Sequence, residues 1–130
     1  MKRRSAKTFP LARRELEFMN IVWDLGESTA QDVQDELARR GRKLRESTVR
    51  TILRVLEEKG FLRHRVDGRA YVYRAIFSRE DARSLAVRDM ATRLFGGSLS
   101  SMITYLLSQE KLSAKEKTNV RSAARRALRR

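Results

Sequence analysis

The sequence of 130 residues has no cysteine, a single histidine and a single proline, Pro10. Without cysteine, the chain can have no disulfide framework, thiolate zinc site or thiol redox switch. No nucleophile stands near a matching base, no phosphate-binding glycine loop is present, and the histidine has no companion motif. The sequence therefore indicates neither an enzyme nor a metal or cofactor site.

Long apolar runs are also missing. No stretch approaches the roughly 18 apolar residues of a membrane-spanning helix. The N-terminal segment MKRRSAKTFP is basic, but no hydrophobic core of a secretory signal follows it. With 41% hydrophobic residues, the chain has enough apolar side chains for one ordinary domain or two small ones. We therefore expect a cytoplasmic protein without membrane insertion.

Acidic residues are few compared with basic ones. The chain has 30 Lys and Arg against 16 Asp and Glu, a net charge of +14. This excess favours a polyanionic partner, and nucleic acid comes ahead of a membrane surface because no segment combines a basic face with a large apolar face. Residues 1–75 hold 18 basic and 11 acidic side chains (net +7), and residues 76–130 hold 12 and 5 (net +7). A DNA-binding module joined to an acidic domain is therefore excluded.

Residues 45–60 have the apolar spacing of an amphipathic helix. At about 100° per residue, one side carries apolar residues at i, i+3, i+4 and i+7. These residues are Val49, Ile52, Leu53 and Leu56. The opposite side carries Ser47, Arg50, Thr51, Arg54 and Glu58. The pattern predicts a helix with Ser47 as its N-cap and Gly60 just after its end.

The outward side of this helix suits the major groove of DNA. Arginine forks match guanine edges, and short hydroxyl side chains reach bases or phosphates. Because Glu57 and Glu58 would repel phosphates, we expect the N-terminal half to be the reading end, as in helix-turn-helix proteins. Any solvated surface helix also carries outward charges, so the helix alone leaves both interpretations open.

Residues 61–74 are predicted to form a basic β-hairpin. Its turn is placed at Asp67-Gly68, which suits a two-residue type I′ turn and sets Arg65 opposite Ala70. Alternation along the strands then separates a packing face from a cationic face. The packing face carries Leu62, His64, Val66, Tyr71 and Tyr73, and the cationic face carries Arg63, Arg65, Arg74, Ala70 and Val72. Arg69 at the tip is either a phosphate or minor-groove contact or a solvated loop charge, and His64 is expected to be half-buried in a strand.

Two further helices precede the reading helix. Core residues at helical spacing, including Met19 and Trp23, predict the first, which ends near Gly26. Thr29 followed by Asp32 predicts a capping box that opens the second. The order of three helices and a hairpin predicts a winged helix-turn-helix DNA-binding domain at residues 1–76, in a mainly α chain with a small β-hairpin wing.

Residues 77–130 are predicted to form a helical dimerisation domain. Ser78 and Ser113 mark helix starts, and Gly96-Gly97 marks a break. Three helices in about fifty residues form too small a unit to bury their apolar faces alone, so we expect a homodimer. The expected interface residues are Leu85, Met90, Leu94, Leu99, Met102, Ile103, Leu106 and Leu107.

Both ends of the chain are basic. The last ten residues, RSAARRALRR, contain five arginines and form either a phosphate-binding arm or a frayed, solvated helix end. The same two alternatives hold for the N-terminal cations Lys2, Arg3, Arg4 and Lys7.

The sequence resembles the penicillinase and methicillin-resistance repressors, a family that also includes copper-responsive repressors. The resemblance covers about residues 11–116. It lies in RRELEFMNIVW, TAQDVQDEL, STVRTILRVLEEKGFL, GRAYVY, LFGGSLSSMI and KLSAKE, in this order and spacing. It implies a homodimeric transcriptional repressor that binds an inverted-repeat operator in double-stranded DNA.

The resemblance also implies roles for single residues. Base reading falls on Thr48, Arg50 and Thr51, of which Thr48 lies at the edge of the polar side of the helix. The phosphate or flanking contacts expected from the helix and the hairpin together are Ser47, Arg54, Arg63, Arg65 and Arg69. The alternative function is an architectural DNA- or RNA-binding protein that uses the charge without reading sequence.

The resemblance further implies how repression is relieved. In antibiotic-responsive members, a membrane sensor-protease cuts the C-terminal domain at an Asn-Phe bond. The aligned pair here is Tyr105-Leu106, and neither residue matches, so the inducing signal stays unassigned. Copper-responsive members carry a C-terminal cysteine cluster, and the absence of cysteine argues against that branch.

Overall fold

The computed structural model describes residues 9–109 and 111–129. The N-terminal cations Lys2, Arg3, Arg4 and Lys7 and the final Arg130 lie outside the described residues.

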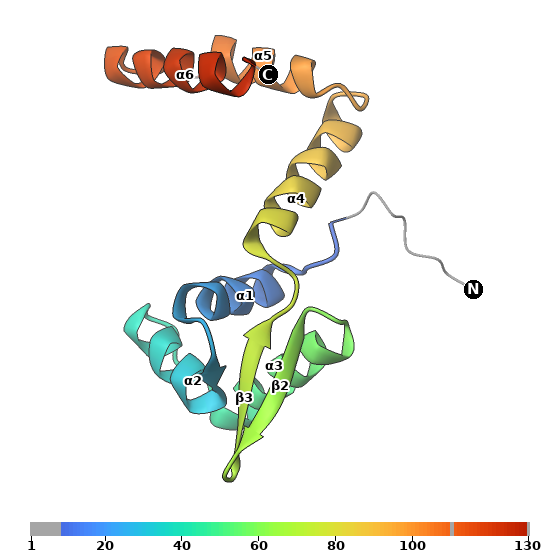
Figure 1. Ribbon diagram of the computed structural model, residues 1–130, viewed down its shortest axis with the longest axis vertical. Coiled ribbons are helices and arrows are strands. Elements are labelled where there is room, and N and C mark those ends of the chain that lie inside the picture. Colours follow the sequence, from blue (N-terminus) through green and yellow to red (C-terminus); the bar gives the residue numbers. More distant parts are fainter. Residues whose placement is uncertain (1–8, 110, 130) are drawn as a thin grey trace, which may run out of the picture. The chain divides into compact units, whose positions relative to one another are not determined.

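The described residues form six helices and three short strands (Figure 1). The helices are α1 (Arg13–Leu25), α2 (Ala30–Arg39), α3 (Glu46–Glu58), α4 (Arg79–Leu94), α5 (Leu99–Gln109) and α6 (Ala114–Ala127). The strands are β1 (Ser28–Thr29), β2 (Leu62–Asp67) and β3 (Ala70–Ala75). The prediction of a mainly α chain with a small β wing is confirmed.

The chain divides into two compact units, and the division falls within α4. The first unit reaches Asp89 and the second begins at Met90. The predicted boundary between residues 76 and 77 separates DNA binding from dimerisation, and this functional division stays a prediction.

The sheet contains one strand, β1, that the sequence does not predict. Its order is β1-β3-β2, with both pairs antiparallel. Ser28 of β1 lies opposite Tyr73, and Thr29 lies opposite Val72. Two residues are too short a run to show an alternating pattern, which is why β1 escapes sequence analysis.

The core of the first unit brings together α1, α2, α3 and the sheet. Side chains with less than 2% exposure come from every one of these elements. They include Phe18, Met19, Ile21, Val22, Val33, Leu37, Val49, Leu53, Leu56 and Leu62. The indole Nε1 of Trp23 donates to the carbonyl oxygen of Phe77 at 2.8 Å, which fastens α1 to the segment after β3.

Helix ends in the chain follow local capping rules. The Thr29 hydroxyl accepts from the Asp32 amide at 3.1 Å, and the Asp32 carboxylate accepts from the Thr29 amide at 2.9 Å. This reciprocal pair is the predicted capping box. The Ser78 hydroxyl likewise accepts from the Asp81 amide at 3.0 Å at the start of α4.

The predicted N-cap of α3 is wrong. The helix starts at Glu46, Arg45 is its N-cap residue, and no side chain caps it. The Val49 amide donates to the Arg45 carbonyl oxygen at 3.0 Å, which places Ser47 inside the first turn. Glu46 supports this earlier start, because an acidic residue is favourable in a first turn and its carboxylate binds Arg50 one turn later.

The predicted turn of the wing is displaced by one residue. Asp67 pairs with Ala70, so the loop is Gly68-Arg69 and the strand register differs by two residues from the prediction. Gly68 has φ +64°, whereas no described non-glycine residue has positive φ. A type II′ turn needs positive φ only at a first-position glycine, while a type I′ turn at Asp67-Gly68 would need it at Asp67 as well. The shift of two leaves the predicted faces unchanged.

The predicted packing face of the wing is buried only near its base. Leu62 is 1% exposed and Tyr73 6%, but Val66 is 62% and Tyr71 51% exposed. The distal half of the hairpin extends past the helices of the first unit, so no core lies against it (Figure 1). On the predicted cationic face, Val72 is buried, and it lies opposite Thr29 of β1 in the sheet.

The second unit buries little of its apolar surface. From Met90 onward, the described residues that are buried are Ala91 and Met102. The Phe95 and Tyr105 rings pack at a centroid distance of 5.6 Å. In the part of the chain that the structure describes, no helix is long and apolar enough to cross a membrane.

We expect Leu53→Ala to lower the free energy of unfolding by about 2–5 kcal/mol, because it removes a large buried side chain and leaves a cavity. Leu53 is 0% exposed. Urea unfolding followed by the fluorescence of Trp23, the only tryptophan, measures the change. Val66→Ala on the exposed wing is the control and should stay within about 0.5 kcal/mol of the parent. Equal losses for the two variants would contradict the assigned core.

Candidate nucleic-acid interface

The rotation of α3 about its axis is set by its buried side. Val49, Leu53 and Leu56 are 0% exposed, so the helix cannot turn without exposing them. The opposite side therefore faces solvent. It presents Ser47, Arg50, Thr51 and Arg54 as exposed residues, and Thr48 at its edge is half-buried.

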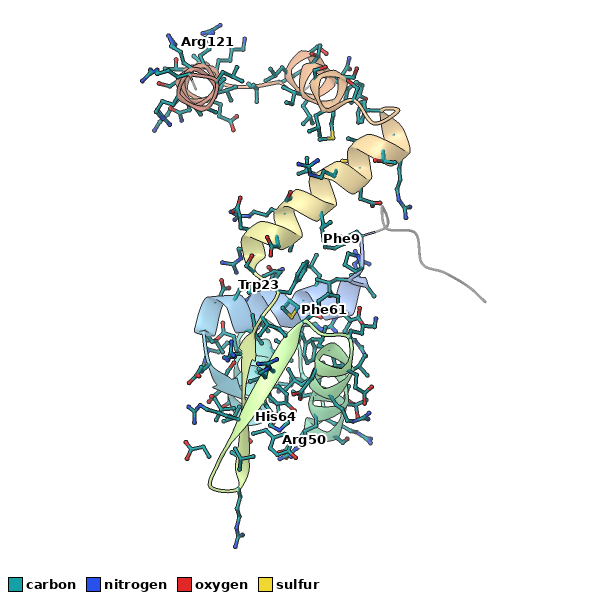
Figure 2. All side chains as sticks on the ribbon, turned by 45° about the vertical axis from the view of Figure 1, so that its right-hand side comes forward. Phe9, Trp23, Arg50, Phe61, His64 and Arg121 are labelled. Atoms are coloured by element: carbon teal, nitrogen blue, oxygen red, sulfur yellow. The ribbon has the colours of Figure 1, made fainter. Side chains whose placement is uncertain are left out.

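A groove of about 650 Å³ lies between α3, the start of α2 and the wing. Its wall on α3 includes Arg50, Thr51 and Arg54. The wing contributes His64, Arg69, Tyr71 and Tyr73, and the start of α2 contributes Gln31. Figure 2 shows Arg50 and His64 close together where α3 meets the wing.

The structure brings only part of the predicted site into this groove. Arg50, Thr51, Arg54 and Arg69 line it together. Ser47 and Thr48 lie on α3 outside the lining, and so do two wing arginines, Arg63 and Arg65. These two share the sheet face opposite the one that carries His64 and Tyr73.

Sequence reasoning missed the aromatic wall of the groove. Alternation placed Tyr71 on the packing face, but the side chain is 51% exposed and opens to the groove. Its position near the turn, far from the strand end that meets the core, was the signal for this exposure. Gln31 was also missed, because nothing in the local sequence shows that the start of α2 approaches the wing.

Each arginine on the outward side of α3 is paired with a carboxylate of the same helix. Arg50 Nη2 lies 2.6 Å from Glu46 Oε2, and Arg54 Nη1 lies 3.4 Å from Glu58 Oε2. The hydrogen bond with Glu46 raises the pKa of Arg50 above its ordinary value. Both pairs are solvent-exposed, so water and salt screen them and another anion can compete for the guanidinium groups.

The arginines of the wing differ in how they are compensated. Arg65 Nη2 lies 2.9 Å from Glu27 Oε1, and this hydrogen bond lowers the pKa of Glu27. Arg69 at the tip is exposed and makes no ion pair or hydrogen bond within the described chain. Of the arginines in the groove, Arg69 is therefore the one most available to an external anion.

Glu57 connects α3 to the wing. Its carboxylate lies 2.7 Å from His64 Nδ1 and accepts from the His64 backbone amide at 3.3 Å. The imidazole in turn stacks on the Tyr71 ring, with centroids 3.8 Å apart. Burial, and then the nearby Glu57 charge, raise the pKa of Tyr73 beside this cluster. His64 is half-buried in a strand, as expected, and its partner is a carboxylate of α3.

The groove offers charged and hydrogen-bonding groups to a ligand. Its residues offer guanidinium, hydroxyl and amide groups together with exposed aromatic rings. Among residues 9–109 and 111–129, no group of three or more His, Asp or Glu side chains is placed to hold a metal ion.

Two helices followed by an antiparallel hairpin beside the second of them define a protein of the winged-helix class. Sequence comparison identifies the family within the winged-helix class. The sequence profile of the penicillinase repressor family matches residues 11–126. The chain therefore belongs to the penicillinase repressor family.

Several known proteins are similar to this chain over most of their length. The methicillin resistance regulatory protein MecI of Staphylococcus aureus is 24% identical over 116 residues, which cover 89% of this chain and 94% of MecI. The penicillinase repressor of Bacillus licheniformis is 29% identical over 102 residues, 78% of this chain and 79% of the relative. An uncharacterized 16.5 kDa protein of Latilactobacillus sakei is 31% identical over 106 residues, 82% of this chain and 72% of the relative.

We expect Glu57→Ala to loosen the wing from α3. β2 is an edge strand, and its His64 amide donates to Glu57 rather than to water. Loss of this acceptor should speed hydrogen exchange at that amide by about tenfold, the equivalent of one ordinary hydrogen bond. Amide exchange followed by NMR measures it. Glu58→Ala, which removes the neighbouring carboxylate, is the control and should leave the amide unchanged; an unchanged rate in Glu57→Ala would refute the link.

Proposed function

We propose that this protein is a cytoplasmic transcriptional repressor that binds an inverted-repeat DNA operator as a homodimer and blocks a promoter by occupying it. The observation that carries the proposal is the outward side of α3. Arg50 and Thr51 stand exposed on a rigidly seated helix, beside a wing that adds a further cation, Arg69. Membership of a family with named repressors supports the same conclusion.

In the proposed complex, the N-terminal half of α3 enters the major groove. Arg50 offers a fork of donors to a guanine edge. The Thr51 hydroxyl already donates to the Ser47 carbonyl oxygen at 2.9 Å, so its oxygen is free to accept from a base amino group. Thr48 contacts a base from the edge of the helix. Because its side chain is half-buried, it can reach only a base that lies close to the helix.

Other side chains bind the phosphates on either side of the bases that are read. Ser47 and Arg54 flank the reading positions on α3, and Arg69 reaches the backbone from the wing tip. Arg63 and Arg65 lie on the outer face of the wing, so they contribute to the local positive potential and to phosphates beyond the groove.

We expect Arg50→Ala to cost about 1–3 kcal/mol on the true operator and to relax the preference at one base pair, because it removes a base contact. Arg69→Ala removes a phosphate contact instead. This variant should bind operator and random DNA more weakly by a similar factor. The slope of log K against log salt should fall in magnitude by about one. Footprinting of the chain's own promoter region identifies the operator, and competition against random DNA near physiological salt gives both affinities.

The two variants serve as controls for each other, since each removes one arginine from the same groove. If both lose affinity equally on operator and random DNA, the reading role is wrong. That result would favour the alternative function, an architectural protein that binds DNA or RNA through charge alone.

The proposed dimer forms through the second unit and the preceding turns of α4. Large apolar side chains are left exposed there, with Leu94 at 71% and Ile103 at 53%. The other exposed members of the predicted interface are Met90, Leu99, Leu106 and Leu107, while Leu85 is half-buried and Met102 is buried. A second copy of the chain would cover this surface, and a dimer places two reading helices on half-sites about one helical turn apart.

We expect the parent chain to have twice its chain mass of 15.1 kDa by light scattering at micromolar concentration. Ile103→Glu should shift it to a monomer, because a carboxylate would be buried in an apolar contact. Operator affinity should fall with it, since two half-sites are no longer bound by linked domains. Val66→Glu, at an equally exposed wing residue, should stay dimeric. A parent chain that is monomeric would refute the proposed dimer.

The proposal extends to relief of repression by a membrane sensor-protease. Tyr105 and Leu106 are 52% and 49% exposed within α5. A cut between them would detach Leu106, Leu107 and α6 from the rest of the dimer surface and so lower operator affinity. Because the bond lies inside a helix, cutting requires α5 to unwind locally.

A further inference from the structure

The last helix, α6, carries a row of cations along one side. Lys117, Arg121 and Arg125 are spaced four residues apart, and Arg129 continues the spacing just beyond the helix. We call Lys117, Arg121 and Arg125 the basic stripe. Successive members are offset by only about 40° around the axis. Figure 2, which views α6 along its axis, shows Arg121 pointing away from the helix.

The basic stripe is not neutralised by its own helix. Residues three and four positions apart are neighbours on a helix surface, and opposite charges there stabilise it while like charges destabilise it. The neighbours of Arg121 and Arg125 at these positions include no acidic residue. Within the described part of the chain, no ion pair or hydrogen bond compensates the three side chains of the stripe.

The contrast with α2 and α3 is direct. There, Arg39 and Arg40 both pair with Glu36, and Arg50 pairs with Glu46. In α6, the single acidic residue, Glu116, lies on a different side of the helix from the stripe. The stripe therefore concentrates uncompensated positive charge at a cost to helix stability, and an external polyanion would relieve that cost.

The rest of the helix leaves the stripe free for such a partner. Val120, Ala123 and Ala127 lie on the other side of α6, and none of the described residues of this helix is buried. The apolar side can pack against another surface while the stripe stays in solvent.

We propose that the basic stripe of α6 is a second binding surface for double-stranded DNA, which contacts phosphates outside the segment that α3 reads. This inference rests on the proposed function in one respect, namely that the chain binds duplex DNA. From Lys117 to Arg125, the stripe spans about 12 Å at 1.5 Å per residue. Phosphates on one DNA strand follow each other every 3.4 Å or so along the axis, so three long cationic side chains match one short run of backbone.

Duplex DNA is favoured over an acidic protein by the composition of the stripe. Lysine and arginine are spaced evenly, with no exposed aromatic or large apolar side chain on that side from Lys117 to Arg125, and the exposed Leu128 on the same side lies beyond Arg125. A protein interface normally depends on such anchors, whereas phosphate binding depends on charge alone. Single-stranded RNA is disfavoured for the same reason, since it is bound largely by stacking on aromatic rings.

The test compares two variants of the full chain that remove equal charge from the same helix. Arg121→Gln/Arg125→Gln removes two cations of the stripe. Lys115→Gln/Arg126→Gln removes two cations from another side of α6. Glutamine is a good helix former, so both should keep the helix content and molar mass of the parent, measured by circular dichroism and light scattering.

Affinity for a 40-base-pair duplex of mixed sequence is then measured over a range of KCl concentrations. This length is about four helical turns and leaves DNA on both sides of any site of ordinary size. In the stripe variant, the magnitude of the slope of log K against log salt should fall by about 0.9 for each lost phosphate contact, or by about 1.8 per protomer. The control variant should keep the parent slope, and Arg121→Lys/Arg125→Lys should restore it.

Each other outcome overturns the inference in a recognisable way. Equal slopes for the stripe and control variants would mean that the stripe is an ordinary solvated face, even if sequence-specific binding through α3 holds. A loss seen with a single-stranded RNA of the same length but not with the duplex would assign the stripe to RNA. If the parent chain does not bind the duplex at all, the proposed function itself fails.

Discussion

Burial of one side of α3 is the constraint on which the rest of the interface depends. Val49, Leu53 and Leu56 contact side chains from α1, α2 and the sheet in a single core, so the axis and the rotation of α3 are both fixed by close packing. The wing is seated on the same core through Leu62 and Tyr73. Recognition groups on the helix and on the hairpin are therefore positioned relative to each other by shared apolar contacts, and polar contacts such as Glu57 with His64 refine that position.

Sequence reasoning succeeds where a periodic signal is long. The 3.6-residue spacing predicts the buried sides of α1, α2 and α3, and the Thr29–Asp32 pair predicts the start of α2. It fails where several positions for a turn or a helix start have similar free energy. Asp67-Gly68 and Gly68-Arg69 both supply a glycine to a two-residue turn, and the choice between them depends on pairing along the whole of β2 and β3. The N-cap of α3 fails for a related reason, because the Glu46–Arg50 pair allows the helix to start earlier than its hydroxyl residues suggest.

The groove shows a second limit of sequence reasoning. Alternation tells which face of a strand a side chain occupies, but it does not tell how far the core extends beneath that face. Tyr71 and Val66 share the face of Leu62 and Tyr73, yet they lie beyond the core and are exposed. The arginines on α3 could be predicted from the helix alone, whereas the aromatic wall and Gln31 required the three-dimensional arrangement.

The ion pair between Arg50 and Glu46 has a consequence for discrimination between DNA sequences. In the free protein, Glu46 occupies the donors that a guanine edge would use, and it therefore acts as an internal competitor for the same guanidinium group. A guanine at the right position offers two acceptors and draws Arg50 away from the carboxylate. A base pair without them leaves Arg50 bound to Glu46, so a wrong sequence gains nothing from this arginine. In the proposed complex, binding at the correct base therefore includes the cost of separating Arg50 from Glu46, a cost that DNA without the matching guanine does not incur, so Glu46 lowers the affinity for the operator.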